Sequence, residues 1–223
     1  MKFPALAALI AIMASVPTAI AAEAPIVARA PVWVYLEKVP GRFDGVTLPE
    51  NPPARELDEL SRFILGGMVF GWNFTYAPGD ASRKVTESFS LEPIKVIDER
   101  DPRFRILEVS ADFPRLNCWA EFTYDAATLR RQSYWDSVVF KSAKGRGTGN
   151  LNDGMAGVKE AYANALKQAV RAYARKIEKN KPKEIRGEAL LRETPRLFAD
   201  EGSFVAEVRV ILNVRDMIPY SVY

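Results

Sequence analysis

The chain of 223 residues contains no histidine. No other side chain supplies a neutral imidazole near physiological pH, so this absence excludes Ser-His-Asp and Cys-His catalytic devices and zinc sites built on histidine. Carboxylate-based, lysine-based and tyrosine-based chemistry remain open. No complete catalytic motif is present either. We therefore predict a protein that is not an enzyme and has no catalytic, cofactor-binding or metal-binding residues.

Cysteine is almost absent as well, since Cys118 is the single one in the chain. One cysteine cannot form an internal disulfide, and the apolar neighbours Leu116, Trp119 and Phe122 predict a buried thiol rather than a reactive one. A chain of this size can bury roughly 70% of its unfolded surface. A hydrophobic core can therefore form without covalent cross-links.

The first 21 residues have the pattern of a secretory signal peptide. Lys2 precedes an apolar run over residues 3–16, and Ala19 and Ala21 satisfy the small-residue rule for cleavage after about Ala21. The run is too short for a membrane span, and no cysteine stands at the cleavage site to carry a lipid anchor. We therefore predict an exported protein of a bacterial periplasm whose mature chain has no transmembrane segment.

Charge is nearly balanced in the mature chain. Loss of Lys2 lowers the count of Lys and Arg from 31 to 30 against 28 Asp and Glu, which leaves a net charge of +2. So small an excess gives no global electrostatic attraction to nucleic acid. No nucleic-acid partner is predicted.

The clearest pattern in the chain is an amphipathic helix over Met155–Ile177. Apolar residues recur at spacings of three and four, and polar residues occupy the opposite face. Asn152 and Asp153 are predicted to cap the start of the helix through their side chains. Alanines on or beside the apolar stripe allow close approach of another element. We therefore expect this helix to lie across a sheet.

Strand-length segments fill most of the remaining chain. They cover residues 32–36, 68–76, 85–97, 104–111, 117–124, 133–140, 184–192 and 204–213, and residues 54–63 form a short helix after Pro52-Pro53. Short connections between the strands indicate antiparallel pairing. The predicted fold class is α+β, a mostly antiparallel sheet with one long amphipathic helix packed across it and a short N-terminal helix.

The predicted organisation has three parts. They are a signal peptide (1–21), an antiparallel β-rich part (22–144) and a helix-strand-strand part (145–223). The boundary is placed at residue 144 because glycines and asparagines gather just after it. The alternative is that the second and third parts form one continuous domain.

An aromatic stripe occupies one face of the strand predicted over residues 68–76. It consists of Phe70, Trp72, Phe74 and Tyr76. One interpretation is an exposed platform on which sugar rings or bases stack. The other is the inner face of a sheet, where aromatic side chains contribute large buried areas. The core interpretation is favoured, because no exposed charges or amides accompany the stripe.

The main candidate binding site is a basic run at the end of the long helix. It comprises Arg171, Arg175, Lys176, Lys179, Lys181 and Lys183. Such a cluster can hold an anionic glycan, an anionic lipid or an acidic protein partner. The alternative is a solvated helix end whose cations complement the helix dipole.

Three other patterns give weaker functional signals. Gly145–Gly149 is predicted as a loop whose backbone amides can cradle phosphate, but its spacing fits neither the dinucleotide-binding nor the P-loop motif, and a closely packed turn is favoured. Asp98, Glu99 and Asp101 form an acidic cluster with two interpretations. It could bind a cation or act as an acid/base pair, or it could be a charged surface turn, which is favoured. Residues 150–153 faintly suggest a calcium loop, although helix capping explains them better.

The last third of the chain carries a family resemblance. A glycine-rich segment at Gly145–Gly149 is followed by an alanine-bearing helix with a basic tail and by two strands, the second containing Phe204–Val210. This order resembles the amino-terminal domain of FlgT-type flagellar assembly proteins and related small envelope lipoproteins. The chain departs from the lipoproteins in lacking their anchor cysteine. The resemblance implies an assembly or scaffold role without catalytic residues.

Three functions are compared on these grounds. The leading one is an exported, non-enzymatic structural or assembly factor of the cell envelope, flagellum-associated by the resemblance, with an envelope protein as partner. The second is a module that binds an anionic glycan or lipid through the basic helix end. The third is a histidine-free cell-wall hydrolase, which requires two carboxylates facing each other across a cleft.

Overall fold

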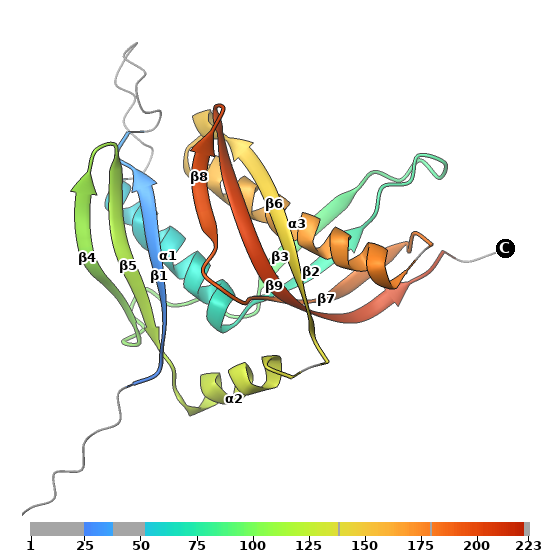
Figure 1. The fold of residues 1–223 in the computed structure, drawn as a ribbon, viewed down its shortest axis with the longest axis horizontal. Coiled ribbons are helices and arrows are strands. Elements are labelled where there is room, and N and C mark those ends of the chain that lie inside the picture. Colours follow the sequence, from blue (N-terminus) through green and yellow to red (C-terminus); the bar gives the residue numbers. More distant parts are fainter. Residues whose placement is uncertain (1–24, 38–51, 138, 179, 221–223) are drawn as a thin grey trace, which may run out of the picture.

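The computed structural model describes residues 25–37, 52–137, 139–178 and 180–220 (Figure 1). The predicted signal peptide (1–21) and Lys179 of the basic run lie outside the described residues. The elements are β1 (Val27–Tyr35), α1 (Pro53–Val69), β2 (Trp72–Ala77), β3 (Ser88–Pro93), β4 (Phe104–Asp112), β5 (Arg115–Thr123), α2 (Ala126–Trp135), β6 (Lys141–Asn150), a 3-10 turn (Leu151–Asp153), α3 (Met155–Ile177), β7 (Glu184–Leu191), β8 (Arg196–Asp200) and β9 (Ser203–Ile218).

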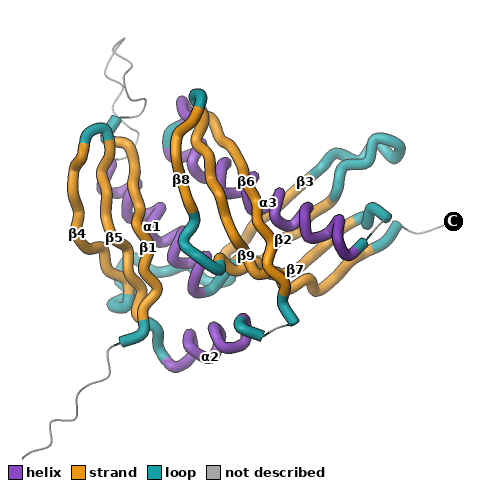
Figure 2. Tube along the Cα trace, in the orientation of Figure 1, coloured by secondary structure: helices purple, strands orange, loops and turns teal. Residues whose placement is uncertain are grey.

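The strands form two antiparallel sheets. One has the order β1-β5-β4, and the other has the order β3-β2-β7-β9-β6, with β8 paired to β9. Helix α3 packs on β6 and β9 of the larger sheet, and α1 packs on β1 and β5 of the smaller one. The sheets stand side by side with β1 next to β8, where the Trp33 Nε1–H donates to the Leu197 carbonyl at 3.3 Å (Figure 2). This arrangement confirms the predicted α+β class.

One hydrophobic core joins these layers. Val32 of β1, Leu60 of α1, Leu166 of α3 and Val210 of β9 belong to the same cluster of buried side chains. The larger sheet takes β2 and β3 from before residue 144 and β7 and β9 from after it, and residue 144 itself lies within β6. No helix within the described ranges has the length and apolarity that crossing a membrane requires.

Helix α3 has the predicted bounds, and its predicted face is buried. The buried members of the stripe are Val158, Ala161, Tyr162, Ala165, Leu166, Ala169 and Val170. Burial ends near Ala174, and Ile177 is 49% exposed. The predicted capping by Asn152 and Asp153 is wrong: Gly154 is the N-cap residue, without a side-chain bond. Instead the Asn150 side chain accepts from the Asn152 backbone N–H at 3.0 Å and stabilises the preceding 3-10 turn.

The glycine-rich segment is a strand rather than the predicted loop. Residues 145–149 lie within β6, where Gly145, Gly147 and Gly149 pair with Val208, Ala206 and Phe204 of β9. A cradle for phosphate needs free backbone amides. In β6 the backbone is extended, pairs with β9 and is covered by α3, so its amides do not converge on one point and the phosphate-loop interpretation is wrong.

The glycines of β6 are required because α3 lies almost directly on this strand. A Cβ built on Gly145 would lie 1.9 Å from the Ala165 carbonyl oxygen, and one on Gly147 would lie 2.1 Å from the Ala165 nitrogen. A Cβ on Gly149 would lie 2.0 Å from the Gly157 carbonyl oxygen. Alanines on the helix and glycines on the strand therefore let the two backbones touch, with no side-chain layer between them.

The strand predicted over residues 133–140 is wrong. Helix α2 extends to Trp135 and β6 begins at Lys141. A capping box starts α2, since the Asp125 carboxylate accepts from the Thr128 backbone N–H at 2.8 Å and the Asp125 backbone N–H donates to the Thr128 hydroxyl at 2.7 Å. The Arg131 guanidinium donates to the Phe70 carbonyl at 2.8 Å. Helix α2 thus supports the end of α1.

The region of the aromatic stripe combines a helix end with a strand. Helix α1 continues past the predicted residue 63 to Val69, Gly71 turns the chain with φ +76°, and β2 begins at Trp72. Phe70, Trp72, Phe74 and Tyr76 are all buried, with at most 6% of each residue exposed. The stripe is therefore core and not a stacking platform.

Two single residues of the sheets have informative positions. Pro93 ends β3, an edge strand, where a proline is tolerated because it has no backbone N–H to donate to a ladder. Cys118 is buried, as predicted, and burial raises the pKa of its thiol. Strand β8 was not predicted.

Candidate anion-binding site

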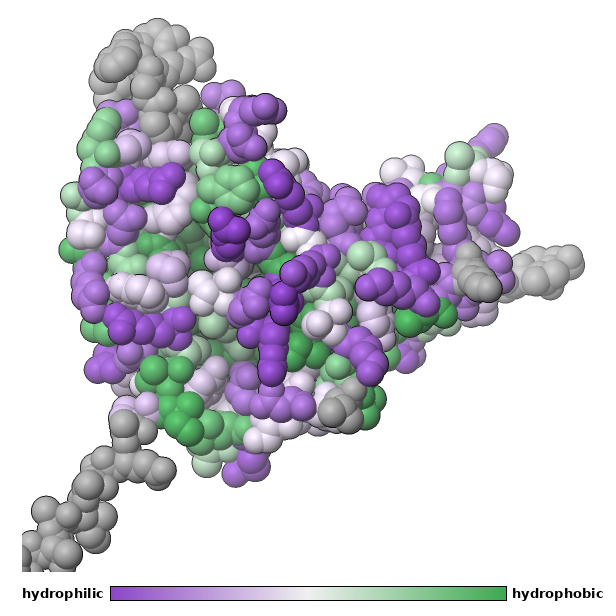
Figure 3. Space-filling view, viewed as in Figure 1, coloured by the Kyte–Doolittle hydropathy of each residue, from purple (hydrophilic) through white to green (hydrophobic). Residues whose placement is uncertain are grey.

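A pocket of about 250 Å³ lies at the C-terminal end of α3, between the helix and the β2–β3 hairpin. Arg171 and Arg175 of α3 and Lys181, four residues past its end, line the pocket. Tyr76 and Glu87 line it from the hairpin side. Strongly hydrophilic side chains surround the last turns of α3 in Figure 3. We refer to this feature as the basic pocket.

The periodicity of α3 explains how its two arginines meet. Residues four apart lie on one face of a helix, so Arg171 and Arg175 project to the same side. Lys181 approaches from the segment beyond the helix, and its Nζ donates to the Gly79 carbonyl oxygen of the hairpin at 3.0 Å. That bond links the segment after α3 to the hairpin across the pocket.

The structure divides the predicted basic run. Arg171, Arg175 and Lys181 line the pocket, whereas Lys176 and Lys183 do not. The hairpin residues Tyr76 and Glu87 were missed as site residues, because only the tertiary fold brings β2 and β3 to the end of α3. The alternation of residues 68–76 places Tyr76 on a buried face but gives no sign that its hydroxyl reaches a pocket.

The two carboxylates of the basic pocket, Glu87 and Glu178, both accept hydrogen bonds from other groups of the protein. Glu87 accepts a hydrogen bond from the Tyr76 hydroxyl at 2.7 Å, and its Oε1 lies 3.8 Å from Arg171 Nη1. Burial and then the bond to Glu87 raise the pKa of Tyr76 well above its usual range, so the phenol stays neutral and continues to donate. Glu178 accepts from the backbone N–H of Asn180 at 2.9 Å.

Arg175 differs from its neighbours in having an unused guanidinium. Within the described ranges it makes neither a hydrogen bond nor an ion pair, whereas Arg171 and Lys181 each have a partner. Three cations and two carboxylates give the lining a formal charge of +1. An arginine fork binds a carboxylate or phosphate through two parallel hydrogen bonds. The pocket is just below the roughly 300–1,000 Å³ typical of small-molecule sites. The basic pocket is therefore of a size to hold a small ligand that carries one carboxylate or phosphate group.

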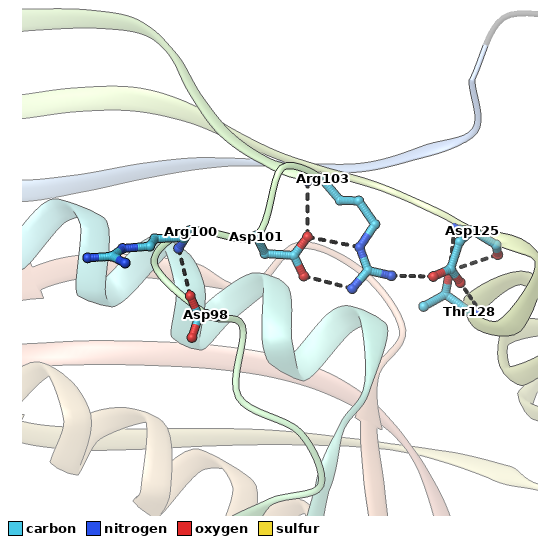
Figure 4. A network of polar contacts seen from close by, with 6 residues as sticks. All are labelled: Asp98, Arg100, Asp101, Arg103, Asp125 and Thr128. Atoms are coloured by element: carbon cyan, nitrogen blue, oxygen red, sulfur yellow. Dashed lines mark hydrogen bonds and ion pairs between the residues drawn. The ribbon is translucent and has the colours of Figure 1, made fainter.

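The acidic turn before β4 has a structural role (Figure 4). The Asp101 carboxylate accepts two bonds from the Arg103 guanidinium, at 2.9 Å from Nε and 2.7 Å from Nη2. Arg103 also pairs with Asp125, the N-cap residue of α2, and Asp98 accepts from the Arg100 backbone N–H at 2.8 Å. Each carboxylate drawn in Figure 4 is thus held by protein donors. The charged-turn interpretation explains this cluster.

Lowered carboxyl pKa values in this network predict a loss of stability in acid. Hydrogen bonds from Arg103 lower the pKa of Asp101, and those from Thr128 lower the pKa of Asp125. Such a group stabilises the folded state fully above its unfolded pKa, about 4, and loses that contribution as pH falls through its folded pKa. Asp101→Asn should therefore lower the melting temperature at pH 7 and flatten its decline below pH 4 in calorimetric scans. The exposed Glu92→Gln is the control; an equal flattening there would contradict the assignment.

Metal ligation has no support in the described part of the chain. Those residues include no group of three or more Cys, Asp or Glu side chains placed to hold an ion. The basic pocket instead presents three cations, Arg171, Arg175 and Lys181, which are groups that can bind an anion.

The comparisons with known proteins define the family of the chain. One family model matches residues 16–220. A protein of Treponema pallidum (strain Nichols) named "Uncharacterized protein" is 39% identical over 196 residues, which cover 86% of this chain and 82% of that protein. The chain belongs to the same family as this treponemal protein. No solved structure matches the chain significantly.

Proposed function

We propose that the protein is an exported, non-enzymatic factor of the bacterial cell envelope that holds an anionic group of an envelope glycan or lipid in the basic pocket. One observation carries the proposal: Arg171, Arg175 and Lys181 converge on a single pocket in which Arg175 has no partner among the described residues. A solvated helix end needs no such convergence. The group bound is a carboxylate or a phosphate.

The surroundings of the three cations favour binding over simple solvation. Tyr76, Pro78 and Pro182 contribute apolar atoms to the walls, and Tyr76 is only 2% exposed. Partial exclusion of water strengthens the attraction between a guanidinium and an anion, because the local dielectric constant falls. The pocket is nevertheless open at the surface, so added salt will screen the interaction. The proposal therefore predicts binding that is specific in its residues and sensitive to salt.

A matched pair of charge reversals tests the proposal. Arg175→Glu should weaken binding to phosphatidylglycerol vesicles or to polygalacturonate by about tenfold or more, because a charge-assisted hydrogen bond contributes roughly 1.5–3 kcal/mol. Lys176→Glu makes the same change in charge one residue away but outside the pocket. It should keep binding within about threefold, since a single exposed charge contributes little.

Equilibrium binding measured at low and high salt checks this prediction. Circular dichroism of both variants shows whether the fold is kept. An equal loss of binding in the two variants would mean that general charge attraction acts instead of a pocket. Unchanged binding in Arg175→Glu would remove the basic pocket from the function.

Envelope assembly is a second candidate function, favoured by the outer side of the smaller sheet. Strand β4 is an edge strand, and Val109 within it is 57% exposed. Phe113 at its end is 71% exposed, and Trp119 on the neighbouring β5 is 36% exposed. Exposed edges and apolar side chains are suited to a protein partner. The resemblance to FlgT-type domains supports a flagellum-associated role of this kind.

An affinity capture from envelope extract separates the two candidates. A defined protein retained at high salt would support assembly through apolar contacts, because salt does not weaken them. Capture of glycan or lipid alone, lost as salt rises, would support the basic pocket.

A further inference from the structure

A second and larger pocket of about 390 Å³ lies between α1 and the segment that follows β3. Phe63 of α1, Trp72 of β2 and Ile97 contribute aromatic and aliphatic surface to it. The rings of Phe63 and Trp72 pack against each other with centroids 5.2 Å apart. Trp72 is 2% exposed and Ile97 is 1% exposed, so this side of the pocket continues into the core. We call it the α1 pocket.

Gly66 in the last turn of α1 opens the α1 pocket. A Cβ built there would meet no heavy atom closer than the Lys95 carbonyl oxygen at 4.0 Å. At the next residue, Gly67, there is no room for a side chain, because a Cβ there would lie 1.9 Å from the Trp72 ring. Close packing therefore requires Gly67, whereas neither packing nor a positive φ requires Gly66. Glycine inside a helix costs about 1 kcal/mol relative to alanine. Gly66 lines the α1 pocket, and the missing side chain at this position leaves space in the pocket wall.

Cations surround this apolar wall. They are Arg55 and Arg62 of α1, Lys95 after β3 and Lys159 of α3, against the two carboxylates Glu59 and Glu99. The formal charge of the lining is thus +2. Arg62 pairs with Asp58 and Glu99, yet its enclosed Nε–H has no acceptor among the described residues. Such unused donor capacity is uncommon at buried positions.

We propose that the α1 pocket binds an amphiphilic anion, an apolar body with one carboxylate or phosphate. The apolar body lies over Gly66 against Phe63 and Trp72, and the charged head meets the basic rim. The volume falls within the roughly 300–1,000 Å³ of small-molecule sites, which are mostly apolar with a few placed polar groups. None of the lining residues is shared with the basic pocket, so the proposal is independent of the proposed function.

Decanoate titrated calorimetrically into the full mature chain tests this proposal, with decan-1-ol as the neutral probe of equal chain length. Decanoate should bind at least tenfold more tightly than decanol. Gly66→Leu, which fills the pocket, should weaken decanoate binding at least tenfold. Its melting temperature should not fall, because leucine is a better helix former than glycine. Gly66→Ala should give a smaller loss of binding and keeps the test valid if the leucine variant does not fold.

Two controls fix the meaning of each result. Lys95→Gln should weaken decanoate more than decanol, whereas Arg175→Glu should leave decanoate binding unchanged. Undiminished decanoate binding in both Gly66 variants, or equal affinity for decanol, would overturn the α1 pocket as an anion site. Loss of decanoate binding in Arg175→Glu would place the ligand in the basic pocket and would also overturn this proposal.

Discussion

Replacing Gly147 by valine is expected to lower the free energy of unfolding strongly. A Cβ at this position would lie 2.1 Å from the Ala165 nitrogen and 2.5 Å from the Ala161 carbonyl oxygen, both backbone atoms of α3. Backbone inside a helix cannot move aside as a flexible side chain can. The helix must therefore lift off the sheet and open the contact between α3 and β6. Overpacking of a core costs roughly 1–3 kcal/mol and occasionally more. We expect at least about 3 kcal/mol here, because two methyl groups follow the clashing Cβ.

Thr148→Val is the matched control for this substitution. Thr148 precedes Gly149 on the same strand and is exposed, so a valine there points away from α3. Exposed substitutions usually change stability by no more than about 0.5 kcal/mol. Urea denaturation followed by circular dichroism measures both variants. A Gly147→Val protein as stable as Thr148→Val would mean that α3 does not rest on the β6 backbone.

Leu166→Ala is expected to lower the free energy of unfolding by about 2–5 kcal/mol, the usual cost of emptying a buried leucine site. Leu166 is 1% exposed at the centre of the buried face of α3. It belongs to the core cluster that α3 shares with the sheets, so its truncation leaves a cavity inside that cluster. The expected loss is a large fraction of the roughly 5–15 kcal/mol that stabilises a typical domain.

Lys167→Ala serves as the control for the core substitution. It truncates the adjacent side chain on the polar side of α3, where removal of a charge should change stability by no more than about 0.5 kcal/mol. Thermal and urea unfolding of the two variants give the comparison. Equal stability of Leu166→Ala and the unaltered protein would show that this face of α3 is not packed on the sheet.

Periodicity was sufficient to predict α3 because each side of that helix has one kind of environment. Its bounds, Met155–Ile177, and its buried residues follow from spacings of three and four. β6 was missed because its inward side chains are not large and apolar. The strand does alternate with a period of two, but its inward residues are small: Ala143, Gly145, Gly147 and Gly149. Glycine usually weakens a strand. Glycine occurs in β6 because the backbone of α3 lies too close to this strand for a side chain to fit between them.

The errors near the other helices have local causes. The capping box of Asp125 and Thr128 was a signal for α2 that the strand-like residues beyond it outweighed. At the end of α1, the aromatic alternation from Phe70 hid the turn at Gly71, whose positive φ separates helix from strand. In both places a local feature, a capping box in one and a single glycine with positive φ in the other, decided the structure.

About half of the basic pocket could be predicted from the sequence. The helical spacing places Arg171 and Arg175 together, and Lys181 follows within the same charge run. Tyr76 and Glu87 come from a hairpin whose position depends on the pairing of β2 with β7. The α1 pocket could not be predicted, because Arg62 and Lys159 lie on different helices and Gly66 differs from Gly67 only in what surrounds it.

Chemical-shift mapping tests the basic pocket most directly. Glycerol 1-phosphate, a small phosphate ester that fits a pocket of this size, is titrated into the ¹⁵N-labelled protein at low salt. We expect amide shifts to concentrate in residues 76–79, 171–175 and 180–181, to disappear in Arg175→Glu and to persist in Lys176→Glu. Shifts that spread evenly over exposed lysines and arginines, or that survive in Arg175→Glu, would contradict this expectation.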